Sequence, residues 1–395
     1  MLQNIATPAK DPILSLSIEY RADDRDNKVD LGIGVYRNDQ GHTPIMKAVS
    51  DSAKAIAAEQ TTKAYVGLAG CEVFNQSMVD LLLRDTSAYE RVSAIQTPGA
   101  SGALRMIADL IKSTEPGATV WISNPSYINH QPVMEAAGLK VKHYSYFNPV
   151  TKHVDSEAMM ADLAKAGPKD IILLHGCCHN PTGADIRLSD WIAITELALK
   201  NGFIPFVDIA YQGFGDGLES DAAGLRFMAD RVPQMFIATS CSKNFGLYRE
   251  RTGAAMVIAA NIEIAMNAKA KLLQMARATY TMPPDHGAAI VGRILNDEAL
   301  TLSWRTELDT MQKRLLGLRT NLCAALRDET QSTQFDFIEQ HKGMFSVIGF
   351  NNEQMLALKS DHGIYAVGDG RINIAGMQEQ HIDYIAKSVA SVANK

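Results

Sequence analysis

The 395-residue sequence contains no long hydrophobic run and no block of basic residues. Its most apolar stretches, residues 171–174 and 254–260, fall well short of the roughly 20 residues that span a bilayer. Residues 1–20 lack the basic and apolar regions of a secretory signal. We therefore expect a soluble, cytoplasmic protein with no membrane partner. The 38 Lys and Arg and 44 Asp and Glu give a net charge of -6, which argues against nucleic acid as a partner.

Cysteine is scarce as well. The five cysteines are an odd number, and Cys177 and Cys178 are neighbours, which is poor geometry for a disulfide framework. We predict reduced thiols. The segment HGCCHNPTG, residues 175–183, places two His and two Cys close together. Adjacent cysteines in an extended chain point to opposite faces and cannot share a tetrahedral zinc ion, so we expect no metal.

The common nucleotide-binding signatures are missing too. The pattern Gly-x4-Gly-Lys-Ser/Thr is absent, which argues against a nucleoside triphosphatase. The glycines at 213, 215 and 217 do not open a helix in a dinucleotide-binding frame. The segment QTPGASG, residues 96–102, precedes a helix expected from about Ala103. Backbone amides at that helix start, with the Ser101 hydroxyl, can hold a phosphate, although a helix cap without a ligand is at least as common.

What the sequence contains is a large apolar core arranged in alternating elements. The chain is 46% hydrophobic and 21% charged, which excludes a disordered or coiled-coil protein. Strands are expected at residues 119–122, 141–144, 171–174, 204–207, 235–239 and 254–258. Helices are expected at residues 103–111, 131–137, 156–166 and 188–200. This alternation predicts an α/β domain with a mainly parallel sheet sandwiched by helices.

The C-terminal part has a different pattern. A long helix is expected over residues 302–327. Strand-like pieces follow at 335–338, 345–348 and 371–374, and a last helix begins at His381. This mixture predicts a smaller α+β domain, completed by N-terminal residues because chain termini usually lie close together. We expect an N-terminal arm at 1–12, a small domain of 13–44 plus 306–395, and a large domain at 45–305.

Polar residues that could carry chemistry follow three of the expected strands. Lys243 lies in ATSCSKNFG among small, flexible residues, where a lowered pKa would make its amine a nucleophile. Asp208 ends an apolar run, three residues before Tyr211, and a buried acid there is costly unless it is paired. Asn180 can donate from the loop that follows the strand at 171–174. The alternatives are a solvated surface lysine, a capping acid and a turn without a ligand.

Two arginines could bind carboxylates. Arg371 lies in GDGRINIAG and Arg277 in ARATYTMPPDHG. The planar guanidinium can hold a carboxylate through two hydrogen bonds. Either side chain could instead simply cover surface.

Taken in order, these segments resemble one family over essentially the whole chain. The sequence is similar to class I, fold type I, pyridoxal-phosphate-dependent aminotransferases, closest to the aspartate and aromatic amino-acid aminotransferases. The resemblance rests on these segments: DLGIGVYRNDQGHTP, TKAYVGLAG, QTPGASGALR, SNPSYINH, HGCCHNPTGAD, DIAYQGFGDG, SCSKNFGLYRERTGA, YTMPPDHGA and GRINIAGM. It implies the cofactor pyridoxal 5'-phosphate and a fold type I large domain.

The resemblance also implies roles for individual residues. Lys243 would hold the cofactor covalently and move the substrate's α-proton, Asp208 would pair with the ring nitrogen, and His130 would support Asp208. Tyr211 and Asn180 would bind the ring oxygen, and Tyr127 would stack on the ring. The implied phosphate-binding residues are Gly99, Ala100, Ser101, Ser240, Ser242, Arg251 and, from the other subunit, Tyr65.

The implied substrates are small amino acids and 2-oxo acids. Arg371 would bind the α-carboxylate, and Arg277 of a neighbouring subunit would bind a side-chain carboxylate. The implied substrate-binding residues also include Gly34, Tyr127 and Asn180. The resemblance thus implies a homodimer with shared active sites, which exchanges amino groups with 2-oxoglutarate by a ping-pong mechanism.

Four positions depart from the aspartate-specific pattern. Tyr127 stands for Trp, Met282 and Ala64 stand for Asn, and Ser101 stands for Thr. These changes remove bulk or polarity, so we expect aromatic amino acids as well as aspartate to be donors. The alternatives are a strict aspartate aminotransferase, another reaction of the same cofactor such as a β-lyase, and a non-catalytic binding protein that keeps the fold.

Overall fold

The computed structural model describes residues 1–7 and 11–393, and these form two compact units. The larger unit comprises Pro44–Asn180 and Ala184–Arg314. The smaller unit comprises Met1–Thr43, Pro181–Gly183 and the chain from Leu315 onward. The predicted domain boundaries, after residue 44 and before residue 306, are not tested by this division into units and stay a prediction. The predicted arm at 1–12 includes residues 8–10, which lie outside the described residues.

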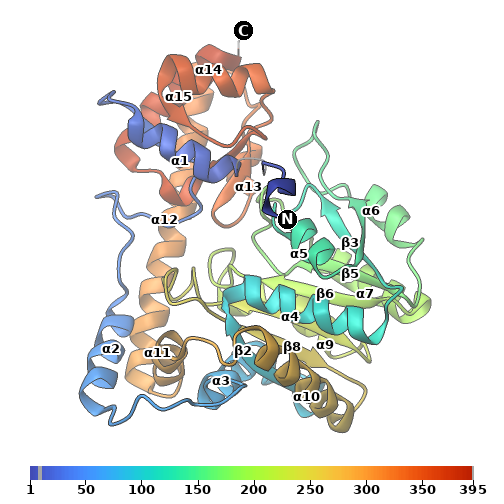
Figure 1. Ribbon diagram of the computed structural model, residues 1–395. Coiled ribbons are helices and arrows are strands. Elements are labelled where there is room, and N and C mark those ends of the chain that lie inside the picture. Colours follow the sequence, from blue (N-terminus) through green and yellow to red (C-terminus); the bar gives the residue numbers. More distant parts are fainter. Residues whose placement is uncertain (8–10, 394–395) are drawn as a thin grey trace. The chain divides into compact units, whose positions relative to one another are not determined.

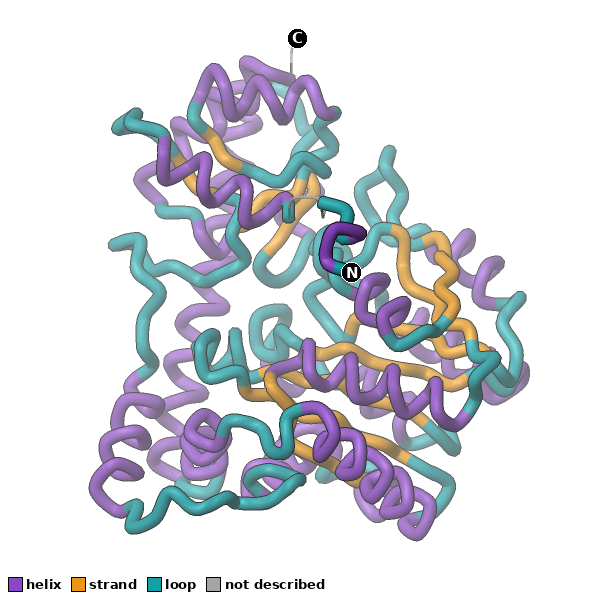
Figure 2. Tube along the Cα trace, in the orientation of Figure 1, coloured by secondary structure: helices purple, strands orange, loops and turns teal. Residues whose placement is uncertain are grey.

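The larger unit is built on a seven-stranded sheet flanked by helices (Figures 1 and 2). In spatial order the strands are β2 (Val92–Pro98), β8 (Thr252–Ile258), β7 (Met235–Ser240), β6 (Ile204–Ile209), β5 (Asp170–His175), β3 (Thr119–Asn124) and β4 (Lys140–Ser145). The pairs from β7 to β4 are parallel, which confirms the predicted mainly parallel sheet. Within this sheet, β8 runs antiparallel to both of its neighbours, β2 and β7. It does so because residues 241–251 return the chain without a crossover helix.

The helices of the larger unit include all four that the sequence pattern predicts. They are α2 (Lys47–Glu59), α3 (Glu72–Leu83), α4 (Gly99–Thr114), α5 (His130–Ala136), α6 (Ser156–Leu163), α7 (Leu188–Asn201), α8 (Leu218–Asp221), α9 (Ala223–Ala229), α10 (Ile262–Thr279) and α11 (Asp285–Leu295). On α4, three- and four-residue steps bring Leu104, Ile107 and Ile111 into one buried cluster with Val120 of β3 and Leu173 of β5. This packing holds the N-terminus of α4 at the sheet.

The helix α12 (Glu298–Thr330) begins in the larger unit and continues into the smaller one. The predicted apolar stripe is buried along it, at Leu308, Met311, Leu315, Leu318 and Leu322. No helix among residues 1–7 and 11–393 is both long enough and apolar enough to cross a membrane.

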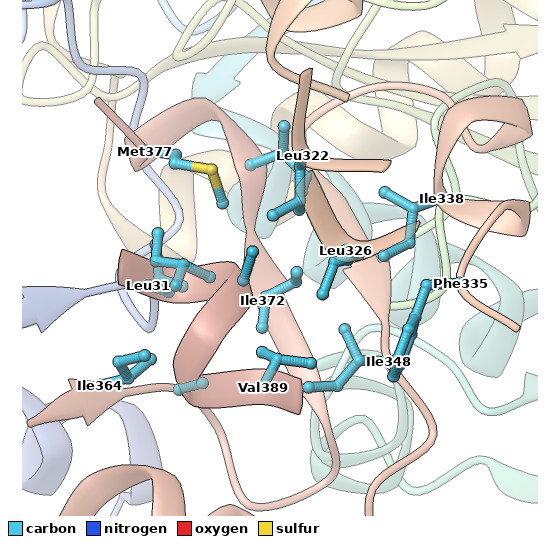
Figure 3. Packing of buried hydrophobic residues seen from close by; sticks show 14 of the residues in the cluster. Leu31, Leu322, Leu326, Phe335, Ile338, Ile348, Ile364, Ile372, Met377 and Val389 are labelled. Atoms are coloured by element: carbon cyan, nitrogen blue, oxygen red, sulfur yellow. The ribbon is translucent and has the colours of Figure 1, made fainter. Parts of the chain in front are cut away.

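The smaller unit has the predicted α+β character. Its helices are α1 (Pro12–Ala22), α13 (Phe337–Gln340), α14 (Asn352–His362) and α15 (Ile382–Ala393). Its strand pairs are β1 (Val29–Asp30) with β10 (Ile364–Tyr365), and β9 (Phe345–Val347) with β11 (Arg371–Asn373). Figure 3 shows its core, where Leu322, Leu326, Ile338, Ile372 and Val389 pack together.

Two local predictions are wrong. Residues 335–338 form a turn and the start of α13, not a strand, and the N–H of Ile338 donates a hydrogen bond to the Phe335 carbonyl. The alternation of Phe335, Asp336 and Phe337 resembles a strand, but both aromatic rings and Ile338 are buried in the same core. The helix expected from Ala103 begins at Gly99, because the left-handed glycine starts it directly after β2.

Candidate active site

A pocket in the larger unit lies where the parallel strands β5, β6 and β7 end. Their register places His175 beside Asp208, and Asp208 beside Ala238, so the segments that follow these strands meet at one edge of the sheet. The predicted residues that line this pocket are Ala100, Ser101, Tyr127, Asn180, Asp208, Tyr211, Ser240, Ser242, Lys243 and Arg251. Topology therefore gathers side chains that are far apart in the sequence.

Asp208 is the buried acid of this pocket, with 8% of its surface exposed. One carboxylate oxygen, Oδ2, accepts a hydrogen bond from Nε2 of His130 at 2.8 Å. The other, Oδ1, is buried and has no hydrogen-bond partner among the described residues. An unpaired buried carboxylate oxygen is costly. The Asp208 side chain is therefore suited to a ligand that brings an N–H group.

His130 is itself held from behind. Its Nδ1 lies 2.9 Å from Oγ of Ser126, and the same hydroxyl lies 3.3 Å from Nε2 of His175. Burial lowers the pKa of His175 well below its usual value, and His179 and His130 lower it further. His175 is therefore neutral at pH 7. It contributes to the orientation of His130 through the shared Ser126 hydroxyl and not through a charge.

Lys243 lies in the loop after β7 and is half-buried. Its Nζ lies 4.8 Å from the centre of the Tyr211 ring. Burial lowers the pKa of the Lys243 amine to about 8; the Asp208 carboxylate opposes this shift and the Arg251 cation adds to it. About one tenth of such an amine is neutral at pH 7, far more than for an exposed lysine. The neutral form is the nucleophile.

The start of α4 forms the second wall of the pocket. Pro98 precedes the helix and offers no side-chain hydrogen bond to the first amides, so these N–H groups are available to an anion. Gly99 has φ of +70°, and an added Cβ there would lie 2.5 Å from Nη2 of Arg251. Arg251 also donates to Oγ of Ser242 at 3.3 Å. This cluster of amides, hydroxyls and one cation is suited to a phosphate.

Asn180 and Tyr211 complete the pocket. Nδ2 of Asn180 lies 3.4 Å from the Tyr211 hydroxyl, and both residues are buried. They enter from the ends of β5 and β6, so a ligand between Lys243 and Asp208 would meet two neutral hydrogen-bonding groups.

Four predicted residues lie elsewhere. Tyr65 and Arg277 are exposed on the larger unit, and neither lines the pocket formed by the described residues. In the smaller unit, Arg371 is buried, donates to the Gly32 carbonyl at 3.0 Å and lies 4.6 Å over the Phe345 ring. A Cβ added to Gly34 would lie 2.9 Å from that same ring. Gly34 and Arg371 therefore share one aromatic neighbour.

The sequence analysis missed five pocket residues and one ring. Leu104, His175, Cys177, Ala210 and Tyr248 also line the pocket, and Phe345 underlies Arg371. His175 is the last residue of β5 and Cys177 follows it by two positions, so their place at the end of a strand could have indicated them. No comparable signal marks Tyr248 or Phe345.

The two neighbouring cysteines are not in the extended conformation that we expected when we excluded a shared ion. Cys178 has φ of +53° and is not extended. The sulfurs of Cys177 and Cys178 and a carboxylate oxygen of Asp221 lie within 4.8 Å of one another. However, the Asp221 carboxylate accepts backbone hydrogen bonds from Gly213, Gly215 and Asp216. All five cysteines are free, and the absence of a metal stays a prediction.

Comparison of the chain with known proteins identifies its family. The family described as Aminotransferase class I and II matches residues 26–389. The chain belongs to this family. An aromatic-amino-acid aminotransferase of Paracoccus denitrificans is 45% identical, and an aspartate aminotransferase of Salmonella typhi is 41% identical, each over 99% of this chain and 100% of the relative.

The solved structures agree with this assignment. An aromatic-amino-acid aminotransferase from Burkholderia pseudomallei, covalently bound to pyridoxal phosphate, aligns with a TM-score of 0.97 at 37% identity and covers 99% of both chains. The protein is therefore an aminotransferase that depends on pyridoxal phosphate. The pocket fits this cofactor, because it offers an amine with a lowered pKa, an open buried carboxylate oxygen and an uncapped helix start.

Proposed function

We propose that this aminotransferase takes amino groups from aromatic amino acids and from aspartate and passes them to 2-oxoglutarate in a ping-pong cycle. The observation that carries this proposal is the pairing of Lys243, whose pKa is lowered to about 8, with the open oxygen of Asp208 in one pocket. The proteins similar to it over the full length include both an aromatic-amino-acid and an aspartate aminotransferase.

The pocket residues divide the work of holding pyridoxal phosphate. When bound, this cofactor receives the amino group and withdraws electrons from the substrate's α-carbon. Asp208 would accept a hydrogen bond from the ring nitrogen and keep that nitrogen protonated, and Tyr211 and Asn180 would donate to the ring oxygen. Tyr127 would stack on the ring. The residues that would hold the phosphate are Gly99, Ala100, Ser101, Ser240, Ser242 and Arg251.

Lys243 supplies the covalent link and the proton carrier. Its flexible side chain ends in an amine that is partly neutral near pH 7. When it is not linked to the cofactor, this amine would take the proton from the substrate's α-carbon and hold it on Nζ until it is returned. Arg251 and the burial of Nζ favour its neutral form.

Substrate carboxylates require the arginines. Arg371 binds the α-carboxylate beside Gly34, with Tyr127 and Asn180 as further contacts. Arg277 and Tyr65 serve the site of a second copy in a homodimer. The exposure of Tyr65, at 87%, supports this assembly, because Val66, the next residue in the chain, is also exposed and exposed apolar surface commonly marks an interface.

Aromatic donors need room and a less polar surface. Met282 is half-buried and Ala64 is exposed, and both replace asparagine in the aspartate-specific pattern. Methionine is flexible and makes favourable contacts with rings. A donor without a second carboxylate would still leave Arg277 unpaired, which limits how well it binds.

We place the enzyme in the cytoplasm.

A donor panel tests the proposal. With 2-oxoglutarate as acceptor, kcat/KM for phenylalanine, tyrosine and tryptophan is expected within about tenfold of that for aspartate. An aspartate value more than about a thousandfold above every aromatic donor would leave a strict aspartate aminotransferase. Adding glutamate to the holoenzyme should shift the visible absorbance band. A β-lyase or a non-catalytic binding protein would not show the same reversible shift.

A further inference from the structure

One side chain of α12 contacts the loop that carries Lys243. Trp304 is fully buried, and its Nε1 donates to the backbone carbonyl of Asn244 at 2.7 Å. Asn244 directly follows Lys243. A buried indole N–H and a buried carbonyl each require a partner, so this hydrogen bond fixes the backbone one residue beyond the lysine.

The same indole also holds the next residue. The rings of Trp304 and Phe245 stack with centroids 4.4 Å apart and an interplanar angle of 4°. Phe245 is fully buried too. Aromatic pairs in such contact contribute beyond the area that they bury. One side chain therefore holds both residues that follow Lys243.

The rest of the loop closes on itself. Gly246 donates from its N–H to the Lys243 carbonyl at 3.0 Å, and Cys241 donates to the Thr252 carbonyl at 3.0 Å. Gly246 has φ of +66°, which allows this tight turn. The loop is thus tied to β8 at its start and to α12 just after the lysine.

The neighbouring turns of α12 contact the other loop of the pocket. Gln312 donates to the Gly215 carbonyl at 2.7 Å, and a Cβ added to Gly213 would lie 2.5 Å from Leu308. Residues 304, 308 and 312 repeat every four positions and share one helix face. This face therefore contacts the loops that follow both Lys243 and Tyr211.

We propose that Trp304 is a positioning residue, which fixes the Lys243 backbone so that the amine reaches the reacting carbon of the substrate. The inference rests on the role proposed above for Lys243. A lysine side chain has four rotatable bonds, so its tip can be placed only if its Cα is fixed. The charged groups that act on the amine are Asp208 and Arg251, and Tyr211 presents its ring to it.

The test compares two tryptophans in the holoenzyme. Trp304→Phe removes an N–H that donates to Asn244. Trp121→Phe is the matched control, since the buried Nε1 of Trp121 has no hydrogen-bond partner among the described residues. Three quantities are measured for each: kcat and KM with aspartate, the melting temperature, and the pH midpoint of the visible band from the Lys243–cofactor link.

Trp304→Phe is expected to lower kcat about tenfold with KM changed less than about twofold. It should also raise the band midpoint by at least roughly 0.3 pH units, because a looser loop admits water to the Lys243 nitrogen. Trp121→Phe should leave both unchanged. A Trp304→Phe enzyme with the wild-type kcat and midpoint, whatever its melting temperature, would overturn the proposal.

Phe245→Leu tests the same contact from the loop side if Trp304→Phe does not fold. It removes the stack and keeps the indole hydrogen bond, so the midpoint should again rise; an unchanged midpoint and kcat would overturn the proposal. Failure of the proposed function is distinguishable, because it would appear without any change at Trp304: the wild-type enzyme would not transaminate the donor panel, and Lys243→Ala would leave the visible band in place.

Discussion

Each of the two units buries a charged side chain, Asp208 in the larger and Arg319 in the smaller, and the two differ in how their hydrogen-bonding groups are used. In the larger unit, Asp208 keeps one buried oxygen without a partner among the described residues. In the smaller unit, the buried guanidinium of Arg319 donates five hydrogen bonds, to four backbone carbonyls between Ile338 and Phe345 and to the Ser346 hydroxyl. The first group is ready for a ligand, whereas the second organises its own chain. Buried charge alone does not mark an active site; unused hydrogen-bonding capacity in a pocket does.

The largest effect is expected from Lys243→Ala. Turnover should fall by at least about a thousandfold, because the covalent link and the proton carrier are lost together. The measurements are kcat and the visible band. Lys243→Arg is the control for charge, since a guanidinium keeps the cation but cannot form the link, and it should be equally inactive. Near-normal turnover in either variant would contradict the assignment of Lys243.

Asp208→Asn should lower kcat about a hundredfold while the protein still binds the cofactor, because the phosphate contacts stay intact. Asp221→Asn is the comparison. The Asp221 carboxylate accepts backbone hydrogen bonds from Gly213, Gly215 and Asp216. Its loss should therefore lower the melting temperature, whereas kcat should change much less than in Asp208→Asn. Equal kcat in the wild type and Asp208→Asn would show that Asp208 is a structural acid like Asp221.

The shared site proposed for a homodimer predicts complementation between subunits. Arg277→Ala and Arg371→Ala homodimers should each lose at least about a hundredfold in kcat/KM for aspartate. Co-expression should restore about one intact site per heterodimer, since in the proposed assembly each arginine of that site comes from a different copy. The readout is aspartate turnover by a heterodimer purified with two affinity tags. No recovery there would mean that each site is built within one chain.

Arg319→Met should act on stability and leave the pocket chemistry alone. Removing the guanidinium leaves buried carbonyls unpaired, so the free energy of unfolding should fall by about 3–5 kcal/mol. Denaturant unfolding measures this loss, and Arg319→Lys should recover part of it because it keeps a donor. If Arg319→Met shifted the visible band without lowering the free energy of unfolding, Arg319 would act on the pocket and not on the stability of its own unit, and the contrast with Asp208 would be wrong.

Much of this architecture could be predicted from periodicity. The strands from β3 to β8 and the long helix α12 follow from apolar runs and three- and four-residue steps, because burial of one face imposes these spacings. Residues 335–338 show the limit: Phe335, Asp336 and Phe337 alternate like a strand, yet they form a turn and the first residue of α13. A short segment takes the conformation that buries its rings in the surrounding core, and a local pattern contains no information about that core.

The sequence by itself determined which residue types stand at the ends of the strands, and the motifs around Lys243, Asp208 and Asn180 were sufficient to indicate the family. Only the tertiary structure decided which of these groups have hydrogen-bonding capacity or reactivity left for a ligand. The open oxygen of Asp208, the lowered pKa of Lys243 and the contact of Trp304 with Asn244 depend on burial and on neighbours distant in the chain. Such properties arise from desolvation and distance, which exist only once the chain is packed.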